Sequence, residues 1–254
     1  MTHPDAFTLA GLWIYPVKSF GGMQIAAPDI TPEGGFAGDR EWIVVRPDGE
    51  MVWQGDIPRM TLMSARLDAG ELHLSAPDGS TMSVPRDQGG PKGIARQYGF
   101  DFNAIDQGDA VSDWLGAHLQ EPVRLVRIGA QAHQWPKVNL IHVVSLNSLA
   151  ALNAAQATNG LPPTEVERFR PNVVLAGDHP PFAEETTPFV DLGTFGLEHV
   201  VSSGRCELVN IRRETAKREI QPLKTIGKLA KGRPASLPAG FGVYAKAVAV
   251  DTSR

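Results

Sequence analysis

The pattern of apolar and polar positions predicts a strand-rich first part of the chain. Short apolar or alternating runs recur in the first ninety residues, and closely spaced turn formers separate them, as is typical of β-hairpins. The predicted strands cover residues 8–15, 40–45, 71–75 and 81–84, with turns at 47–49, 68–70 and 77–79. Residues 85–107 carry several Gly and Pro and little periodicity, so we predict a linker or surface loop there.

The second part of the chain adds helices. Apolar residues recur at helical spacing over 109–119 and predict a helix there. A second helix is predicted over 145–153, where Ser145 can accept a hydrogen bond from the first turn. Leu146, Leu149 and Ala150 are expected on its buried side. A third is expected over 221–230.

Further strands are interleaved with these helices. They are predicted over residues 123–128, 138–144, 172–176, 188–192, 197–201 and 242–250. Strand-rich halves with isolated helices indicate an α+β fold that is mainly β and barrel-like.

Composition narrows the classes of function. A net charge of −4 and a pI near 6.0 argue against nucleic-acid binding, which normally requires a basic face. The single cysteine cannot form an internal disulfide or a four-thiolate cluster, so a reducing, cytoplasmic location is expected. Neither a secretory signal nor an apolar run of about 18 residues is visible, and no membrane association is expected.

Familiar catalytic signatures are absent from the sequence. It contains no G-x-S-x-G, H-E-x-x-H, G-x-x-x-x-G-K-[ST] or G-x-G-x-x-G. The seven histidines show no metal-ligand spacing, and the carboxylates show no paired motif, so a hydrolase is not indicated.

The only cysteine, Cys206, lies beside Arg205 in S-S-G-R-C-E (202–207), directly after an apolar run. A neighbouring cation favours the thiolate, which is the form that acts as a nucleophile or as a soft-metal ligand. Read locally, however, the same residue could be a small buried apolar side chain, and this reading stays open.

Two basic clusters could bind an anion. In R-F-R-P-N (168–172), Arg168, Arg170 and Asn172 alternate, so an extended segment would place all three on one face. Guanidinium groups hold phosphate well, but surface salt bridges would need the same residues. The second cluster combines Lys18, in Y-P-V-K-S (15–19), with Arg40, in G-D-R-E-W (38–42).

Together, these motifs resemble the MOSC family with an N-terminal β-barrel domain. The order is Y-P-V-K-S, G-D-R, R-F-R-P-N and R-C, and the resemblance extends from Tyr15 to Ala247. It implies a smaller β-rich N-terminal domain over 1–122 and a MOSC-type β-barrel over 123–254. Members include amidoxime-reducing components and bacterial reductases of N-hydroxylated bases.

The resemblance also implies a molybdenum cofactor and its contacts. By position, Cys206 matches the catalytic cysteine that ligates molybdenum. The matching cofactor-binding residues are Lys18, Ser19, Arg40, Arg170, Asn172 and Arg205. A soft thiolate suits a sulfur-rich metal centre, and each charge-assisted hydrogen bond to the phosphate could contribute about 1.5–3 kcal/mol.

The function implied is a molybdenum-dependent oxidoreductase that reduces small N-hydroxylated compounds. No cysteine is left for an internal cluster and no dinucleotide fingerprint is present, so electrons are expected from a separate ferredoxin or flavoprotein. Two alternatives remain. One is a carrier of sulfur or of the molybdenum cofactor that uses a Cys206 persulfide, and the other is a small-molecule binder whose metal site has decayed.

Overall fold

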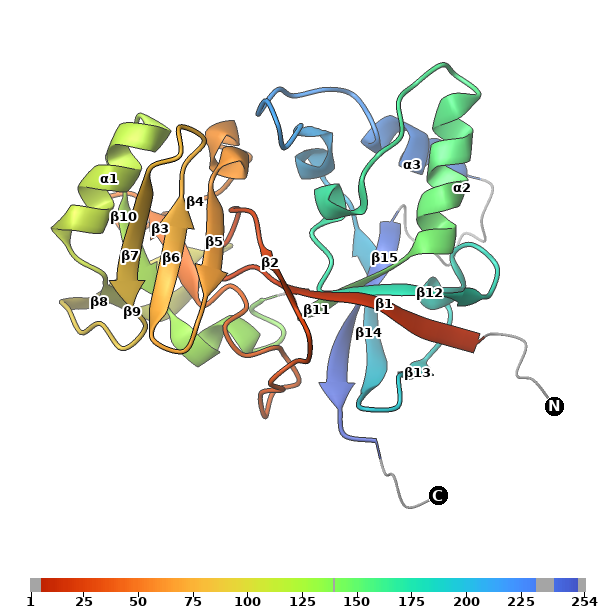
Figure 1. Ribbon diagram of the computed structural model, residues 1–254, viewed down its shortest axis with the longest axis horizontal. Helices are drawn as coiled ribbons and strands as arrows, with labels where there is room; N and C mark the ends of the chain where they lie inside the picture. Colours follow the sequence, from red (N-terminus) through yellow and green to blue (C-terminus); the bar gives the residue numbers. More distant parts are fainter. Residues whose placement is uncertain (1–5, 139, 232–239, 251–254) are drawn as a thin grey trace.

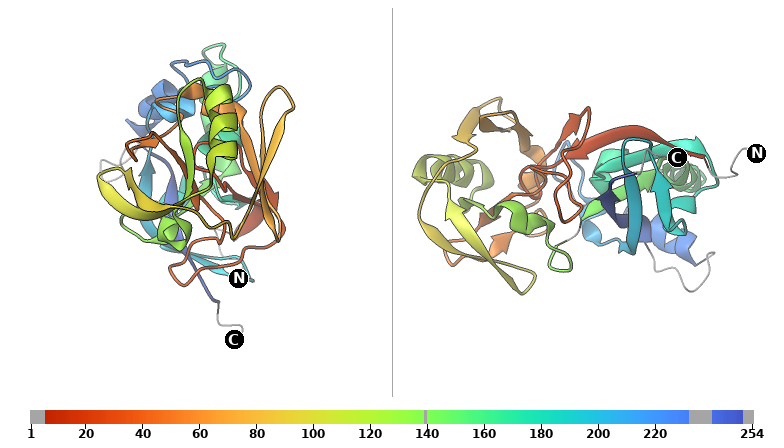
Figure 2. Two further views of the ribbon diagram at one scale, coloured as in Figure 1. Left: turned by 90° about the vertical axis from the view of Figure 1, so that its left-hand side faces the viewer. Right: turned by 90° about the horizontal axis from the view of Figure 1, so that it is seen from below.

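The protein consists of two lobes that lie side by side (Figures 1 and 2). The computed structural model describes residues 6–138, 140–231 and 240–250. Its α-helices are α1 (Asp109–Leu119), α2 (Leu146–Ala157) and α3 (Leu223–Ala230). The strands of the first half are β1 (Ala6–Ile14), β2 (Met23–Ile25), β3 (Trp42–Val45), β4 (Met51–Val52), β5 (Ser64–Leu67), β6 (Glu71–Ser75), β7 (Thr81–Pro85), β8 (Lys92–Gln97) and β9 (Phe100–Asp106). The second half contributes β10 (Arg124–Arg127), β11 (Ile141–Ser145), β12 (Val173–Asp178), β13 (Phe189–Asp191), β14 (Gly196–Gly204) and β15 (Gly240–Val248).

The first lobe contains a small curled sheet, a β-meander and a helix. The five-stranded sheet has the order β4-β3-β10-β9-β8, and β5, β6 and β7 form the separate meander. An isolated bridge between Glu50 and Arg96 brings the outer strand β8 back beside β4, so the sheet curls toward a barrel. Apolar side chains such as Val45, Phe102 and Val126 fill its interior.

The second lobe is built on a seven-stranded sheet with the order β13-β14-β15-β11-β12-β1-β2. Its central strand β11 is buried at every residue, as expected for a strand covered on both faces. Strands β11 and β12 are parallel, and α2 forms part of the crossover between them. Helices α2 and α3 lie on one side of the sheet (Figure 1) and enclose a small core with Leu152, Ile226 and Phe241.

The first strand ties the two lobes together. Residues 6–14 precede every strand of the first lobe, yet β1 pairs with β12 in the second, with Leu9 opposite Leu175. The largest core cluster accordingly contains residues from both lobes, including Trp42 and Leu72 from the first and Val173 from the second. Apolar packing therefore continues across the seam between the lobes.

The predicted fold class is confirmed: the described part of the chain is mainly β with three α-helices, and a small barrel-like sheet belongs to its first half. Helix α1 has the predicted bounds, and Ser145 caps α2 by accepting a hydrogen bond from Asn147 N at 3.0 Å. The predicted buried side of α2 is wrong at Leu146, which is 38% exposed, and at Ala150, which is also exposed, whereas Leu149 is half-buried. The helix buries Ser148, Leu152 and Gln156 instead.

Two strand and loop predictions need correction. The expected loop over 85–107 contains the β8–β9 hairpin, whose two-residue turn is Tyr98-Gly99. Gly99 is a turn-forming residue, but the large aromatic residue Tyr98 precedes it, so the sequence pattern did not indicate a hairpin turn. The strand predicted over 138–144 begins at Ile141, and Asn139 lies outside the described residues. Within the described part of the chain, no helix is both long and apolar enough to cross a membrane.

Candidate functional site

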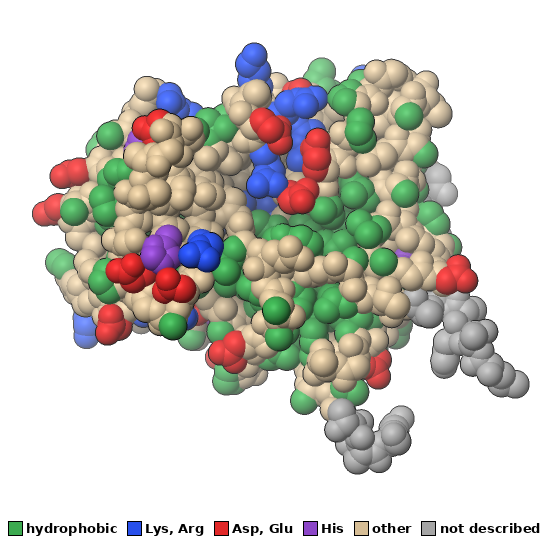
Figure 3. Space-filling view, viewed as in Figure 1, with side chains coloured by type: hydrophobic (Ala, Val, Ile, Leu, Met, Phe, Trp, Pro, Cys, Tyr) green, Lys and Arg blue, Asp and Glu red, His purple; other side chains and the backbone are tan. Residues whose placement is uncertain are grey.

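A cavity opens at the seam between the two lobes. Lys and Arg side chains gather in the upper part of this seam on the face shown in Figure 3, with Asp and Glu side chains among them. Six of the seven predicted site residues contribute to the cavity wall, and they come from segments far apart in the sequence. These are Lys18, Ser19, Arg40, Arg170, Arg205 and Cys206. The fold therefore brings the two basic clusters and the cysteine into one site.

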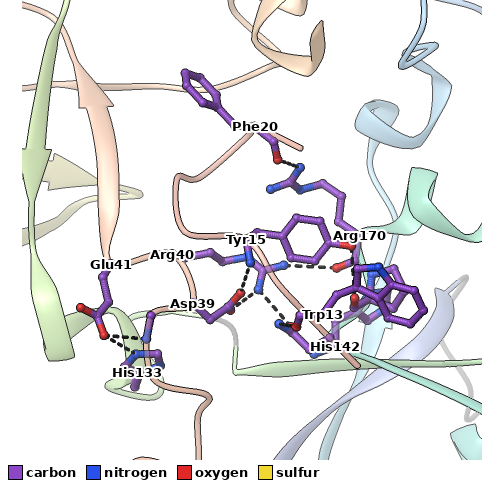
Figure 4. A network of polar contacts seen from close by, with 12 residues as sticks. Trp13, Tyr15, Phe20, Asp39, Arg40, Glu41, His133, His142 and Arg170 are labelled. Carbon is purple, nitrogen blue, oxygen red and sulfur yellow. Dashed lines mark hydrogen bonds and ion pairs between the residues drawn. The ribbon is translucent and has the colours of Figure 1, made fainter. Parts of the chain in front are cut away.

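Three of these residues form a cation cluster, which we define as Lys18, Arg40 and Arg170. The Tyr15 ring lies between the two guanidinium groups, with ring-centroid distances of 4.9 Å to Arg40 Cζ and 4.3 Å to Arg170 Cζ. Arg40 also donates to Asp39, and Arg170 donates to the carbonyl of Phe20 (Figure 4). These contacts fix the positions of both guanidinium groups.

The cluster holds more positive charge than nearby carboxylates balance. Asp39 pairs with Arg40, whereas neither Lys18 nor Arg170 forms a carboxylate ion pair among the described residues. The Nη2 atom of Arg170 is buried without a hydrogen-bond partner. Burial, together with repulsion from Arg40 and Arg170, lowers the pKa of Lys18 to about 7. Such a site favours an anion, which would supply the missing acceptors and counter-charge.

The backbone around the cavity adopts an uncommon conformation. Seven non-glycine residues of the described chain have a positive φ, and four of them line this cavity: Ser19, Arg40, Tyr98 and Arg170, with φ between 54° and 74°. Residues other than glycine occupy this left-handed region rarely, and such residues concentrate at functional sites. Two of these four residues, Arg40 and Arg170, are cationic, and both contribute to the cavity wall.

The only cysteine lies at the C-terminal end of β14, where the strand gives way to a short 3₁₀ helix over Glu207–Asn210. Its side chain is exposed, so the alternative of a small buried apolar residue is wrong. The neighbouring Arg205 donates to Tyr244 Oη at 3.1 Å, which holds its guanidinium beside the cavity. Cys206 is thus accessible to a ligand.

The R-F-R-P-N segment is not extended as predicted. Val166–Phe169 form a 3₁₀ helix and Arg170 is left-handed, so the three polar side chains do not share one face. Arg168 lines the cavity but pairs with Glu219 at 3.2 Å.

Asn172 does not line the cavity. It is fully buried, and its Oδ1 accepts from Arg40 Nη1 at 3.0 Å and from the backbone N–H of His142 at 3.1 Å. Its Nδ2 donates to Trp13 O at 3.1 Å. The geometry makes Asn172 a positioning residue that holds Arg40 toward the cavity.

Several cavity residues were not anticipated from the sequence. The first lobe contributes Trp53, Gln97 and Tyr98, which we call the barrel wall. Trp53 and Tyr98 meet edge to face, with ring centroids 6.5 Å apart. The signal for Tyr98 was the turn dipeptide Tyr98-Gly99, which lay inside the expected loop.

The second lobe adds two more unanticipated residues, Tyr244 and His142. Burial and the nearby Arg205 hold the pKa of His142 well below its usual value, so its ring is neutral. Burial would raise the pKa of Tyr244, but Arg205, Ser203 and Arg40 together outweigh it and lower this pKa. Tyr244 was covered by a predicted strand, and nothing in the alternation of that strand marked it as a cavity residue.

Comparison with known protein families accounts for most of the chain. Residues 6–122 match the family described as "MOSC N-terminal beta barrel domain", and residues 131–252 match the "MOSC domain". The chain belongs to the MOSC family. Its relatives include the mitochondrial amidoxime-reducing component 2 of Rattus norvegicus, which is 29% identical over 82% of this chain and 68% of the relative.

Two other relatives show the range of this MOSC family. The mitochondrial amidoxime-reducing component 1 of Homo sapiens is 29% identical over 86% of this chain and 71% of the relative. The molybdenum cofactor sulfurase of Drosophila melanogaster is 29% identical over 95% of this chain but only 32% of the sulfurase. The chain thus spans about a third of the sulfurase and roughly two thirds of the amidoxime-reducing components.

The donor set of the cavity fits a molybdenum cofactor. No group of three or more His, Cys, Asp or Glu side chains that could hold a bare metal ion occurs in the described chain. A metal here would therefore need most of its ligands from an organic partner, and one accessible thiol completes such a set. The unpartnered Arg170 Nη2 and the uncompensated charge of Lys18 suit a phosphate group.

The segment after the cysteine has a structural role. It reads V-N-I-R-R-E-T over residues 209–215. Asn210 is buried, and its Oδ1 accepts from the backbone N–H of Leu223 at 2.9 Å, at the start of α3. Asn210 therefore fastens α3 to the segment that carries Cys206.

Proposed function

We propose that this protein binds a molybdenum cofactor through Cys206 and reduces small N-hydroxylated compounds. One observation carries the proposal: an exposed thiol and a cation cluster with spare hydrogen-bond donors line the same cavity. The relatives named as amidoxime-reducing components support the choice of reaction.

In this proposal each predicted residue has a defined task. The Cys206 thiolate is the protein ligand of the metal, and Lys18, Arg40 and Arg170 hold the pterin phosphate. Ser19 and Arg205 lie beside them, although the Ser19 hydroxyl already accepts from Gln54 N at 3.1 Å. Asn172 acts through Arg40. The bound cofactor would supply two-electron redox chemistry at molybdenum.

The overall reaction requires an electron source. Cleaving the N–O bond of an amidoxime consumes two electrons and two protons, and releases an amidine and one water molecule. The single cysteine is committed to the metal, so we propose a separate donor, a ferredoxin or flavoprotein, as partner in a reducing, cytoplasmic compartment.

The test is metal analysis of protein that is expressed in a host able to make the cofactor, followed by assay with benzamidoxime. We expect molybdenum near one atom per chain and turnover with reduced viologen, but not with NADH alone. Molybdenum-loaded protein that fails to turn over with reduced viologen would contradict the reductase.

A sulfur carrier is the second candidate, because the exposed Cys206 could hold a persulfide and a molybdenum cofactor sulfurase matches 95% of this chain. The two candidates differ in what they release. A carrier would lose one sulfur atom per chain to a thiol acceptor, as measured by mass spectrometry, whereas a reductase would not.

A further inference from the structure

The cavity has a second set of features beside the cation cluster. Trp53, Gln97 and Tyr98 of the barrel wall all come from the first lobe. Beside them lie the apolar side chains of Ile128 and Val138, which are almost fully buried. This part of the cavity is therefore aromatic and apolar, and it faces the same space as Cys206.

Tyr98 occupies a position that folding alone does not favour. Tyr98 and Gly99 have φ values of +54° and +81°, as a two-residue type I′ turn requires. Asn, Asp or Gly usually fills the first of these positions, since a bulky residue is unfavourable there. The ring is nevertheless 57% exposed, so core burial does not account for it. Its contacts are Trp53 and, at 5.1 Å from the ring centroid, Lys18 Nζ.

Gln97 supplies an unused hydrogen-bond acceptor. The residue is 3% exposed, and its Oε1 is buried with no hydrogen-bond partner. A buried acceptor without a partner is costly, and a ligand that donates an N–H group would satisfy it. The charged residues lining the cavity in the described chain are all Lys or Arg, and no Asp or Glu joins them. Nothing here compensates a cationic ligand, and in the proposed function the cofactor phosphate already occupies the cation cluster, so a neutral ligand is favoured.

We infer that the barrel wall recognises the substrate, and that this substrate is a neutral, planar, aromatic compound with an N–H donor. The aromatic group lies against Trp53 and Tyr98, and the N–H group donates to Gln97 Oε1. This inference rests on the proposed function and assigns its specificity to the first lobe. An aryl amidoxime meets the description, whereas an alkyl amidoxime has the donor but no aromatic face.

The test compares benzamidoxime with acetamidoxime on cofactor-loaded protein. Stacking on aromatic side chains predicts that Tyr98→Ala raises KM for benzamidoxime about tenfold, with kcat and the acetamidoxime KM little changed. Tyr98→Phe should retain the preference. Gln97→Leu should raise KM for both substrates, because both lose the acceptor. Phe100→Ala is the matched control: Phe100 is an exposed aromatic residue on the same hairpin but does not line the cavity.

Two outcomes would overturn this inference. One is an unchanged benzamidoxime preference in Tyr98→Ala protein that still turns over. The other is a loss of molybdenum content in that variant, which would show that the barrel wall binds the pterin of the cofactor and not the substrate. Calorimetric binding of benzamidoxime to the loaded protein separates this inference from the proposed function. If Tyr98→Ala weakens benzamidoxime binding and Phe100→Ala does not, the barrel wall recognises the substrate even if no reduction occurs.

Discussion

The two sides of the cavity are built in opposite ways. The cation cluster rests on buried partners: Asn172 and Asp39 fix Arg40, and the Tyr15 ring separates the two guanidinium groups. The barrel wall instead ends in an exposed hairpin tip, where Tyr98 has few contacts. A rigid side suits a resident cofactor, whereas an exposed side can adapt to ligands that enter and leave. In our proposal, one side of the cavity retains the cofactor and the other selects the substrate. Variants on each side test this division.

The largest effect is expected at the Cys206 thiol, which lines the cavity together with the cation cluster and the barrel wall. Cys206→Ser should reduce benzamidoxime turnover to background, because a hydroxyl is a hard and poorly ionised substitute for a thiolate. The side chain is exposed, so the unfolding midpoint should stay within about 1 °C of wild type. Turnover at the wild-type rate in the Ser variant would refute the assignment of Cys206 as ligand.

Removing a positive charge from the cation cluster should affect the cofactor-binding side of the cavity alone. Arg170→Ala or Lys18→Ala should weaken cofactor retention about tenfold or more, since each removes a charge-assisted contact. Molybdenum content after gel filtration at raised salt measures this. The control is Arg66→Ala, which removes an exposed cation on β5 outside the cavity. If all three variants keep equal molybdenum, the cation cluster does not hold the phosphate.

Asn172→Ala tests whether the cation cluster depends on the buried hydrogen bonds of Asn172. The variant leaves Arg40 Nη1, the His142 N–H and the Trp13 carbonyl without these partners. We expect a loss of about 2 kcal/mol in the free energy of unfolding, measured with urea on cofactor-free protein. Thr158→Ala, which removes an exposed hydroxyl at the end of α2, serves as control. A wild-type unfolding free energy in Asn172→Ala would contradict the positioning role.

The last effect is a pH dependence caused by Lys18. Its pKa is about 7 in the folded protein and 10.5 in an unfolded chain. Between these values the unfolded chain binds more protons, so this residue makes stability rise with pH and adds no slope below pH 7. The difference in unfolding free energy between wild type and Lys18→Met should therefore change from pH 7 to pH 10 in favour of wild type. A flat difference would show that Lys18 is not desolvated.

Much of the architecture follows from local sequence signals. Helix α1 has the predicted bounds because its apolar spacing agrees with its burial, and Ser145 caps α2 as its side-chain chemistry predicts. Lys18, Arg40, Arg170 and Cys206 were predicted by family motifs, and the fold brings them into one cavity. Their proposed roles remain predictions.

The remaining features depend on tertiary contacts. The barrel wall was missed because the hairpin turn carries Tyr98, a residue that propensity disfavours in that conformation. The role of Asn172 depends on Trp13, His142 and Arg40, which are remote from it in sequence. No local pattern could distinguish such a support from a direct ligand.

The position of β1 has a consequence for synthesis on the ribosome. Leu9 pairs with Leu175, so β1 is made long before its partner strand. At about 5–20 residues per second, the delay is roughly ten to thirty seconds. During that interval only the short strand β2 can pair with β1, at Leu12–Ile14, so the rest of the apolar segment A-F-T-L-A-G-L-W-I could pair with another nascent chain. Chaperone capture of this segment would shorten its exposure, and production at lower temperature would lessen aggregation.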